Sequence, residues 1–235
     1  MGISYTREET LAELTSVLAK GTDFLYNSNP VNWRGCIKGT NMPYTEEIIK
    51  ELYDRNIFVH GVIIEGINEI KREESYYTKS HEDLVIARNK NSNRDEEIFV
   101  KELFTNNPFE AELGKVVDFQ IPLKDKLDDS AGKIDLLTFN ENTSEMFIVE
   151  VKKDGSEETA LRCCLEVQTY LQKIEDIEKF VSDFYNAGKI PTKDLKIKLA
   201  VTVFNNSVPA NEFKDETREY LQKLVKDFDI KVCYA

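Results

Sequence analysis

The stretch Gly132-Lys-Ile-Asp-Leu-Leu-Thr-Phe139 is followed by a polar turn and then by Glu145-Met-Phe-Ile-Val-Glu-Val-Lys152. Both segments are apolar runs with few charges, which is typical of strands in a buried sheet. Because side chains alternate along a strand, Glu150 and Lys152 share one face. Pairing the two strands as a hairpin brings Asp135 close to both. Two carboxylates and an amine at the edge of a buried sheet are costly unless a metal or a substrate uses them.

The segments around this hairpin predict an α/β or α+β fold with a mixed central sheet flanked by helices. Three strands in succession favour an antiparallel meander, and the helical crossover after them favours a parallel pairing. The expected chain order is helix, three strands, two helices, strand, helix, strand. The helices are expected at 95–105, 157–173, 175–187 and 209–226, and the strands at 115–121, 132–139, 145–152, 195–204 and 230–234.

The first third of the chain predicts a different kind of structure. Residues 6–20 have the pattern of a capped amphipathic helix that ends at Gly21, and Thr45 caps a second helix from 46 to 55. Residues 22–43 read as a loop, and 57–71 fit either a strand or the start of a buried helix. We therefore expect a mainly helical N-terminal appendage at 1–90 and the main domain at 91–235.

Composition places the chain among globular proteins. It has 235 residues, of which 41% are hydrophobic, and no apolar run approaches the roughly 20 residues of a membrane span. The N-terminus lacks the apolar core of a signal peptide. The four cysteines include the neighbours Cys163 and Cys164 and form no Cys-x-x-Cys pair. These features predict a cytoplasmic protein with reduced thiols and no membrane partner.

The Asp135 strand followed by Glu150-Val-Lys152 resembles the PD-(D/E)xK nuclease superfamily. The Glu-x-Lys triplet alone is unspecific, since it occurs three times in the chain. The resemblance rests on its combination with the aspartate strand and the element order over about residues 92–205. No proline precedes Asp135, which departs from the motif. The resemblance implies a restriction-endonuclease-like fold.

The resemblance also implies an activity, the metal-dependent hydrolysis of phosphodiester bonds, with DNA as the expected substrate. Asp135 and Glu150 are then ligands of Mg²⁺ or Mn²⁺, with the Val151 carbonyl as a further donor. The metal polarises the phosphate and lowers the pKa of its bound water. Lys152 orients or deprotonates that water and stabilises charge in the transition state.

Two helices are expected to contribute further residues. In many members a glutamate precedes an Asn-Pro that ends the first helix, which matches Glu97; Glu96 and Glu102 are alternatives. Some members carry Gln and Tyr on the crossover helix, where this chain spaces Gln168 differently. Arg162, Glu166 and Tyr170 recur every four residues and so share one helix face. We expect Arg162 and Gln168 to contact substrate.

A second interpretation stays open. The formal net charge of −12 opposes the basic surface that usually binds nucleic acid. The fold could then serve as a catalytically inactive module that binds nucleic acid, a partner protein or a second copy. Glu150 and Lys152 would in that case be an ordinary ion pair. The sequence leaves open DNA against RNA, endo- against exonuclease action, and whether Trp33 stacks on a base or packs within the appendage.

Overall fold

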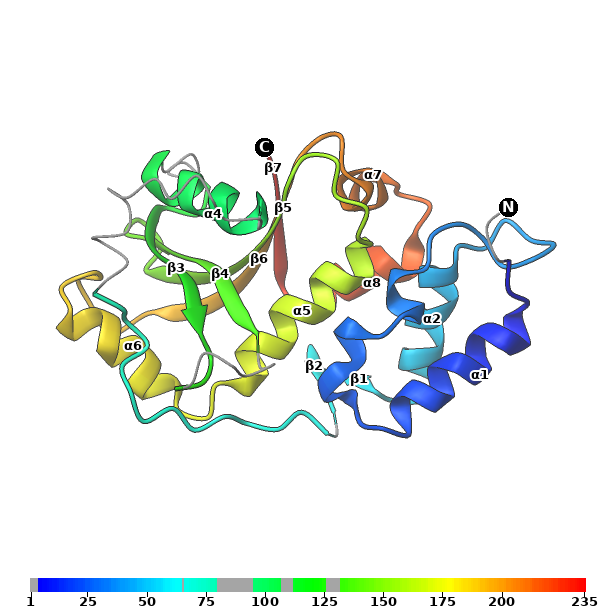
Figure 1. Cartoon of the computed structure of the whole chain (residues 1–235), viewed down its shortest axis with the longest axis horizontal. Coiled ribbons are helices and arrows are strands. Elements are labelled where there is room, and N and C mark those ends of the chain that lie inside the picture. Colours follow the sequence, from blue (N-terminus) through cyan, green and yellow to red (C-terminus); the bar gives the residue numbers. More distant parts are fainter. Residues whose placement is uncertain (1–3, 65, 80–94, 107–111, 126–131) are drawn as a thin grey trace.

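A five-stranded sheet with the order β3-β4-β5-β6-β7 forms the core of the second part of the chain in the computed structural model, in the left half of Figure 1. The structure describes residues 4–64, 66–79, 95–106, 112–125 and 132–235, and the side chains of residues 24 and 95–98 lie outside this description. The strands are β3 (Lys115–Pro122), β4 (Lys133–Asn140), β5 (Glu145–Lys152), β6 (Lys196–Val203) and β7 (Ile230–Tyr234). The first two pairings are antiparallel and the last two are parallel. The predicted mixed sheet is therefore confirmed.

Helices cover both faces of this sheet. Those of the second half of the chain are α4 (Asp95–Asn106), α5 (Ala160–Lys173), α6 (Ile177–Asn186), α7 (Val208–Lys214) and α8 (Glu219–Asp227). On one face, Val100 and Leu103 of α4 pack against Val149 and Val151 in a small apolar cluster. On the opposite face, helices α5, α6, α7 and α8 pack in the larger core. Crossovers between parallel strands are right-handed as a rule, so two that step in the same direction from β5 to β6 and from β6 to β7 are expected to put their helices on one face.

One element differs from its predicted extent. A single helix was expected over 209–226, but the chain forms α7 and α8 with a turn between them. The Asp215 carboxylate accepts hydrogen bonds from the amide and the hydroxyl of Thr217. A side chain that bonds nearby backbone in this way competes with helix continuation. The turn lets α8 lean against the N-terminal region.

The N-terminal region is helical, as expected, and also contains a small hairpin. Its elements are α1 (Arg7–Leu18), the 3₁₀ helices η1 (Thr22–Asn27) and η2 (Pro30–Asn32), α2 (Tyr44–Asp54), β1 (Phe58–Val59) and β2 (Val62–Ile63). His60 and Gly61 between the two short strands both have positive φ, as a tight hairpin turn requires. The region therefore contains a strand pair where the sequence left strand and helix open.

The N-terminal region packs on α5 and α8 rather than on the sheet (Figure 1). Leu14, Ile48 and Leu52 belong to the same apolar cluster as Leu165 and Leu224. The Thr159 hydroxyl donates to the Val31 carbonyl at 2.5 Å, which ties η2 to the start of α5. The boundary expected at residue 90 lies outside the described residues, so the division into two domains stays a prediction. None of the helices in the described part of the chain is long and apolar enough to span a membrane.

Candidate functional site

The hairpin of β4 and β5 places the three predicted site residues on one face of the sheet. Leu136 pairs with Val149, so the next position along each strand sets Asp135 opposite Glu150. Residues directly opposite each other in an antiparallel pair point to the same face. Val149 and Val151 lie in the cluster under α4, so Glu150 and Lys152 point to the α5 side. The predicted alternation along this strand is confirmed.

Asp135 is held by two hydrogen bonds. One carboxylate oxygen accepts from the Val151 amide at 3.0 Å and the other from Gln120 Nε2 at 3.0 Å. Gln120 has φ of 49°, and the β3–β4 register shifts between Val116 and Asp118. Irregularities of this kind redirect a side chain at the edge of a site. Alternation alone gave no sign that Gln120 would reach Asp135.

Lys152 lies at the centre of a group of carboxylates, which we call the Lys152 cluster: Lys152, Glu150, Glu158 and Glu166. Its Nζ is 2.5 Å from Glu150, 2.6 Å from Glu158 and 3.3 Å from Glu166. The side chains of Lys152 and Glu150 are only 4% and 3% exposed. An ammonium taken out of water needs close negative partners, and these three carboxylates supply them.

Helix α5 supplies the opposite wall of the cluster. Glu158 precedes the helix by two residues, and with Arg162, Glu166 and Tyr170 it follows a four-residue repeat that puts all four on one side. The Tyr170 hydroxyl donates to Glu166 at 2.9 Å, and Arg162 Nη2 lies 3.3 Å from Glu158. Glu158 continues this repeat in the sequence, so the repeat could have predicted Glu158 as a residue of the site.

The charges in the cluster are strongly coupled. Burial raises the pKa of Glu150 well above its ordinary value, and the neighbouring Asp135 and Glu166 raise it further against the effect of Lys152. Burial raises the pKa of Glu166 too, but Lys152, a hydrogen bond with Glu150 and Arg162 together bring it below the ordinary value. Glu150 is therefore the more basic carboxyl group of the two and Glu166 the more acidic one.

Lys152 stays charged in this environment. Burial lowers the pKa of its ammonium, but the carboxylates of Glu150, Glu166 and Glu158 outweigh that effect and raise the pKa well above its ordinary value. Such a group holds a fixed positive charge rather than exchanging a proton near neutral pH. The arrangement favours Lys152 as an electrostatic and orienting residue over Lys152 as a base.

The other predicted residues are placed less centrally. Gln168 is buried and donates to Gln172, away from the Lys152 cluster, while Arg162 lies at its rim with its side chain 23% exposed. Glu97 lies in α4, but its side chain and that of Glu96 are outside the described residues. Glu102 is exposed on α4. The structure thus brings Asp135, Glu150, Lys152 and Arg162 together and leaves Gln168 apart.

The position of Trp33 can also be compared with its prediction. Trp33 stacks on Tyr5 with ring centroids 4.2 Å apart, so it packs within the N-terminal region. Across the described ranges, no group of three or more His, Cys, Asp or Glu side chains is arranged to hold a metal ion. Asp135 and Glu150 as metal ligands stay a prediction.

Comparison with known proteins adds no relative. No protein-family model, no curated protein and no solved structure matches the chain. The function of the site has to be argued from its own geometry and chemistry.

Proposed function

We propose that this chain is a metal-dependent nuclease of the PD-(D/E)xK type that hydrolyses phosphodiester bonds in DNA. The observation that carries the proposal is the convergence of Asp135, Glu150 and Lys152 on one face of the sheet, with Lys152 buried among carboxylates. The order of helix, three antiparallel strands, crossover and parallel strand agrees with a restriction-endonuclease-like fold.

Asp135 and Glu150 fit a hard divalent cation such as Mg²⁺ or Mn²⁺. Both offer carboxylate oxygens, the donors that these ions prefer. The repulsion between them, which contributes to the raised pKa of Glu150, is a charge imbalance that a cation would relieve. When bound, such a cation polarises the phosphate and lowers the pKa of a coordinated water.

The residues of this chain have separate roles in the proposed reaction. The fixed charge of Lys152 orients the attacking water and stabilises the negative charge that develops on the phosphate. The Val151 amide and Gln120 hold Asp135 in one orientation. Arg162 at the rim provides a bidentate donor for a phosphate of the substrate backbone.

Cleavage assays on single- and double-stranded DNA and RNA, with Mg²⁺, Mn²⁺ or EDTA, test this proposal. Cleavage of DNA is expected with either metal and not with EDTA. The informative variant is Lys152→Ala, and the matched control is Lys196→Ala. Lys196 of β6 lies next to Glu145 in the strand register. Glu145 is at the far end of β5, seven residues before Lys152. Activity that survives in Lys152→Ala would refute the assigned site.

The alternative is a module that binds nucleic acid or a partner protein without cleaving it. It is favoured by the burial of the Lys152 cluster, because Glu150 and Lys152 are almost fully buried and paired with each other. The net charge of −12 points the same way for a protein partner. Purified protein that cleaves no nucleic acid with either metal would favour this alternative.

A further inference from the structure

Glu158 makes contact with both cations of the candidate site. Its Oε2 lies 2.6 Å from Lys152 Nζ, and its Oε1 lies 3.3 Å from Arg162 Nη2. One carboxylate thus bridges the buried amine and the guanidinium at the rim. Two oxygens of one anion, each facing a different cation, is also the arrangement in which two non-bridging oxygens of a phosphate would be held.

The side chain of Glu158 is more exposed than those of the other carboxylates around Lys152, so it can move away from Lys152 more easily. Its side chain is 26% exposed, whereas those of Glu150 and Glu166 are 3% and 10% exposed. The residue after it is fixed, because the Thr159 amide donates to Asn32 Oδ1 at 2.9 Å. The Glu158 side chain can therefore rotate into water without moving the backbone, at the cost of its ion pairs with Lys152 and Arg162.

The start of α5 lies beside the two cations, but two of its amides already have side-chain acceptors. The Ala160 amide donates to Glu212 at 2.7 Å, and the Arg162 amide donates to the Thr159 hydroxyl at 3.2 Å. An anion bound here would therefore be held by the Lys152 and Arg162 side chains rather than by the helix terminus.

We propose that Lys152 and Arg162 form a phosphate-binding site. The Glu158 carboxylate occupies this site until a phosphate displaces it. The inference rests on the proposed function, because it identifies how that site takes up the phosphodiester group. Glu158 is then a competitive internal anion. Its removal strengthens phosphate binding, whereas removal of either cation weakens it.

The test measures the affinity for inorganic phosphate by isothermal titration of the full chain, with and without Mg²⁺. Glu158→Gln should tighten binding about tenfold, which is about 1.4 kcal/mol. The matched control is Glu157→Gln, which removes the same charge one residue away. Glu157 pairs with Arg34 instead, and its side chain is 75% exposed. Phosphate affinity in Glu157→Gln should stay near that of the wild type.

Adding Arg162→Ala to Glu158→Gln should cancel the gain. The inference is overturned if Glu158→Gln binds phosphate no more tightly than wild type, if Glu157→Gln gains as much, or if the gain survives without Arg162. Circular dichroism checks folding, and Glu158→Ala replaces a misfolded Glu158→Gln; a chain that folds with neither makes Glu158 structural and ends the inference. Tighter phosphate binding without any cleavage would support the site and refute the nuclease.

Discussion

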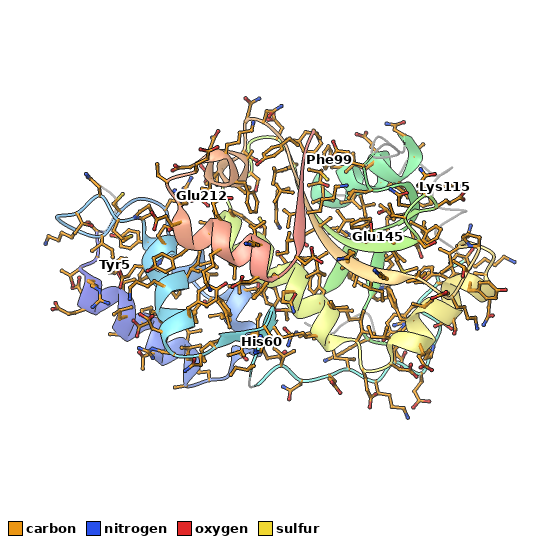
Figure 2. The ribbon with its side chains drawn as sticks, turned by 180° about the vertical axis from the view of Figure 1, so that it is seen from behind. Tyr5, His60, Phe99, Lys115, Glu145 and Glu212 are labelled. Carbon is orange, nitrogen blue, oxygen red and sulfur yellow. The ribbon has the colours of Figure 1, made fainter. Side chains whose placement is uncertain are left out.

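Helix α5 contacts two buried ionic clusters whose carboxylates have different kinds of partner. In the Arg218 cluster (Arg218, Glu46 and Glu212), Glu46 accepts from two amides in the first turn of α8, and Glu212 accepts from an amide at the start of α5. Arg218 lies 3.1 Å from Glu212 and donates to Thr45. Glu212 is labelled in Figure 2, on α7 near the N-terminal region. This cluster caps helices and joins the two parts of the chain.

The carboxylates of the Lys152 cluster have side-chain partners instead. Glu150, Glu158 and Glu166 surround one ammonium, and Glu150 and Glu166 also repel each other. Carboxylates bonded to helix amides stabilise a fold, whereas like charges crowded at one place are typical of sites that bind a cation or an anion. The comparison predicts that substitutions in the Lys152 cluster change cleavage as well as stability, whereas substitutions in the Arg218 cluster change stability alone.

The largest expected effect is the loss of cleavage in the Lys152→Ala variant. Removing the charge beside the attacking water should reduce the rate about 10²–10⁴-fold, the range for a positioned electrostatic or acid–base group. Both proposed metal ligands remain, so binding of Mn²⁺ should persist. The measurement is cleavage with Mn²⁺ together with a Mn²⁺ titration, and Lys196→Ala should retain wild-type rates.

The next effect is on stability, through Arg218→Ala. The buried Glu212 would lose its ion-pair partner and Glu46 a nearby positive charge, and breaking a buried pair costs about 3 kcal/mol. Urea unfolding should show a lower midpoint with an unchanged slope. Cleavage below the transition should stay near the wild-type rate. A variant that loses activity while keeping its stability would erase the proposed difference between the two clusters.

Two substitutions of Asp135 distinguish a structural role of this residue from a role as a metal ligand. Asp135→Ala removes the acceptor of the Val151 amide and should cost about 1–3 kcal/mol. Asp135→Asn keeps an acceptor oxygen and removes the repulsion with Glu150, so its stability should stay within about 1 kcal/mol of the wild type. Both variants should lose metal-dependent cleavage. Thermal melts in EDTA distinguish them, and equal melting of the two variants would contradict this assignment.

The sheet was predictable because its strands carry their own signal. Each of β3 to β7 was expected within a few residues of its bounds, since apolar runs bounded by turn residues mark buried strands. The α4 face is as apolar as the pattern implies, with Phe99, labelled in Figure 2, against Phe204 at 4.8 Å. The 3₁₀ helices at Thr22–Asn27 and Pro30–Asn32 were missed, because segments rich in Asn, Ser and Pro read as loop.

The candidate site was predictable only in part. Asp135, Glu150 and Lys152 follow from strand alternation and a hairpin register, both of which are local. The contact of Glu158 with Lys152 depends on the path of the turn between β5 and α5, and that of Gln120 with Asp135 on a residue with positive φ. The positive φ of Gln120 leaves no periodic pattern in the sequence, whereas Glu158 continues the four-residue repeat of Arg162, Glu166 and Tyr170.

The smallest expected effect is a difference in pH dependence between the wild type and Glu150→Gln. Because the pKa of Glu150 is raised in the folded state, the folded chain binds its proton more tightly than the unfolded chain does. Stability from this residue is therefore complete at pH values below its ordinary pKa and is lost as pH rises toward the raised value.

Glu150→Gln cannot ionise, and its amide can still donate to Glu166. Melting temperatures measured in EDTA from pH 5 to 8 should fall more steeply for the wild type than for this variant. Glu46 and Glu212 also have raised pKa values, but they are present in both proteins, so the difference isolates Glu150. Mg²⁺ competes with the same proton, so its affinity for the wild type should increase with pH. Parallel melting curves would place the proton elsewhere in the Lys152 cluster.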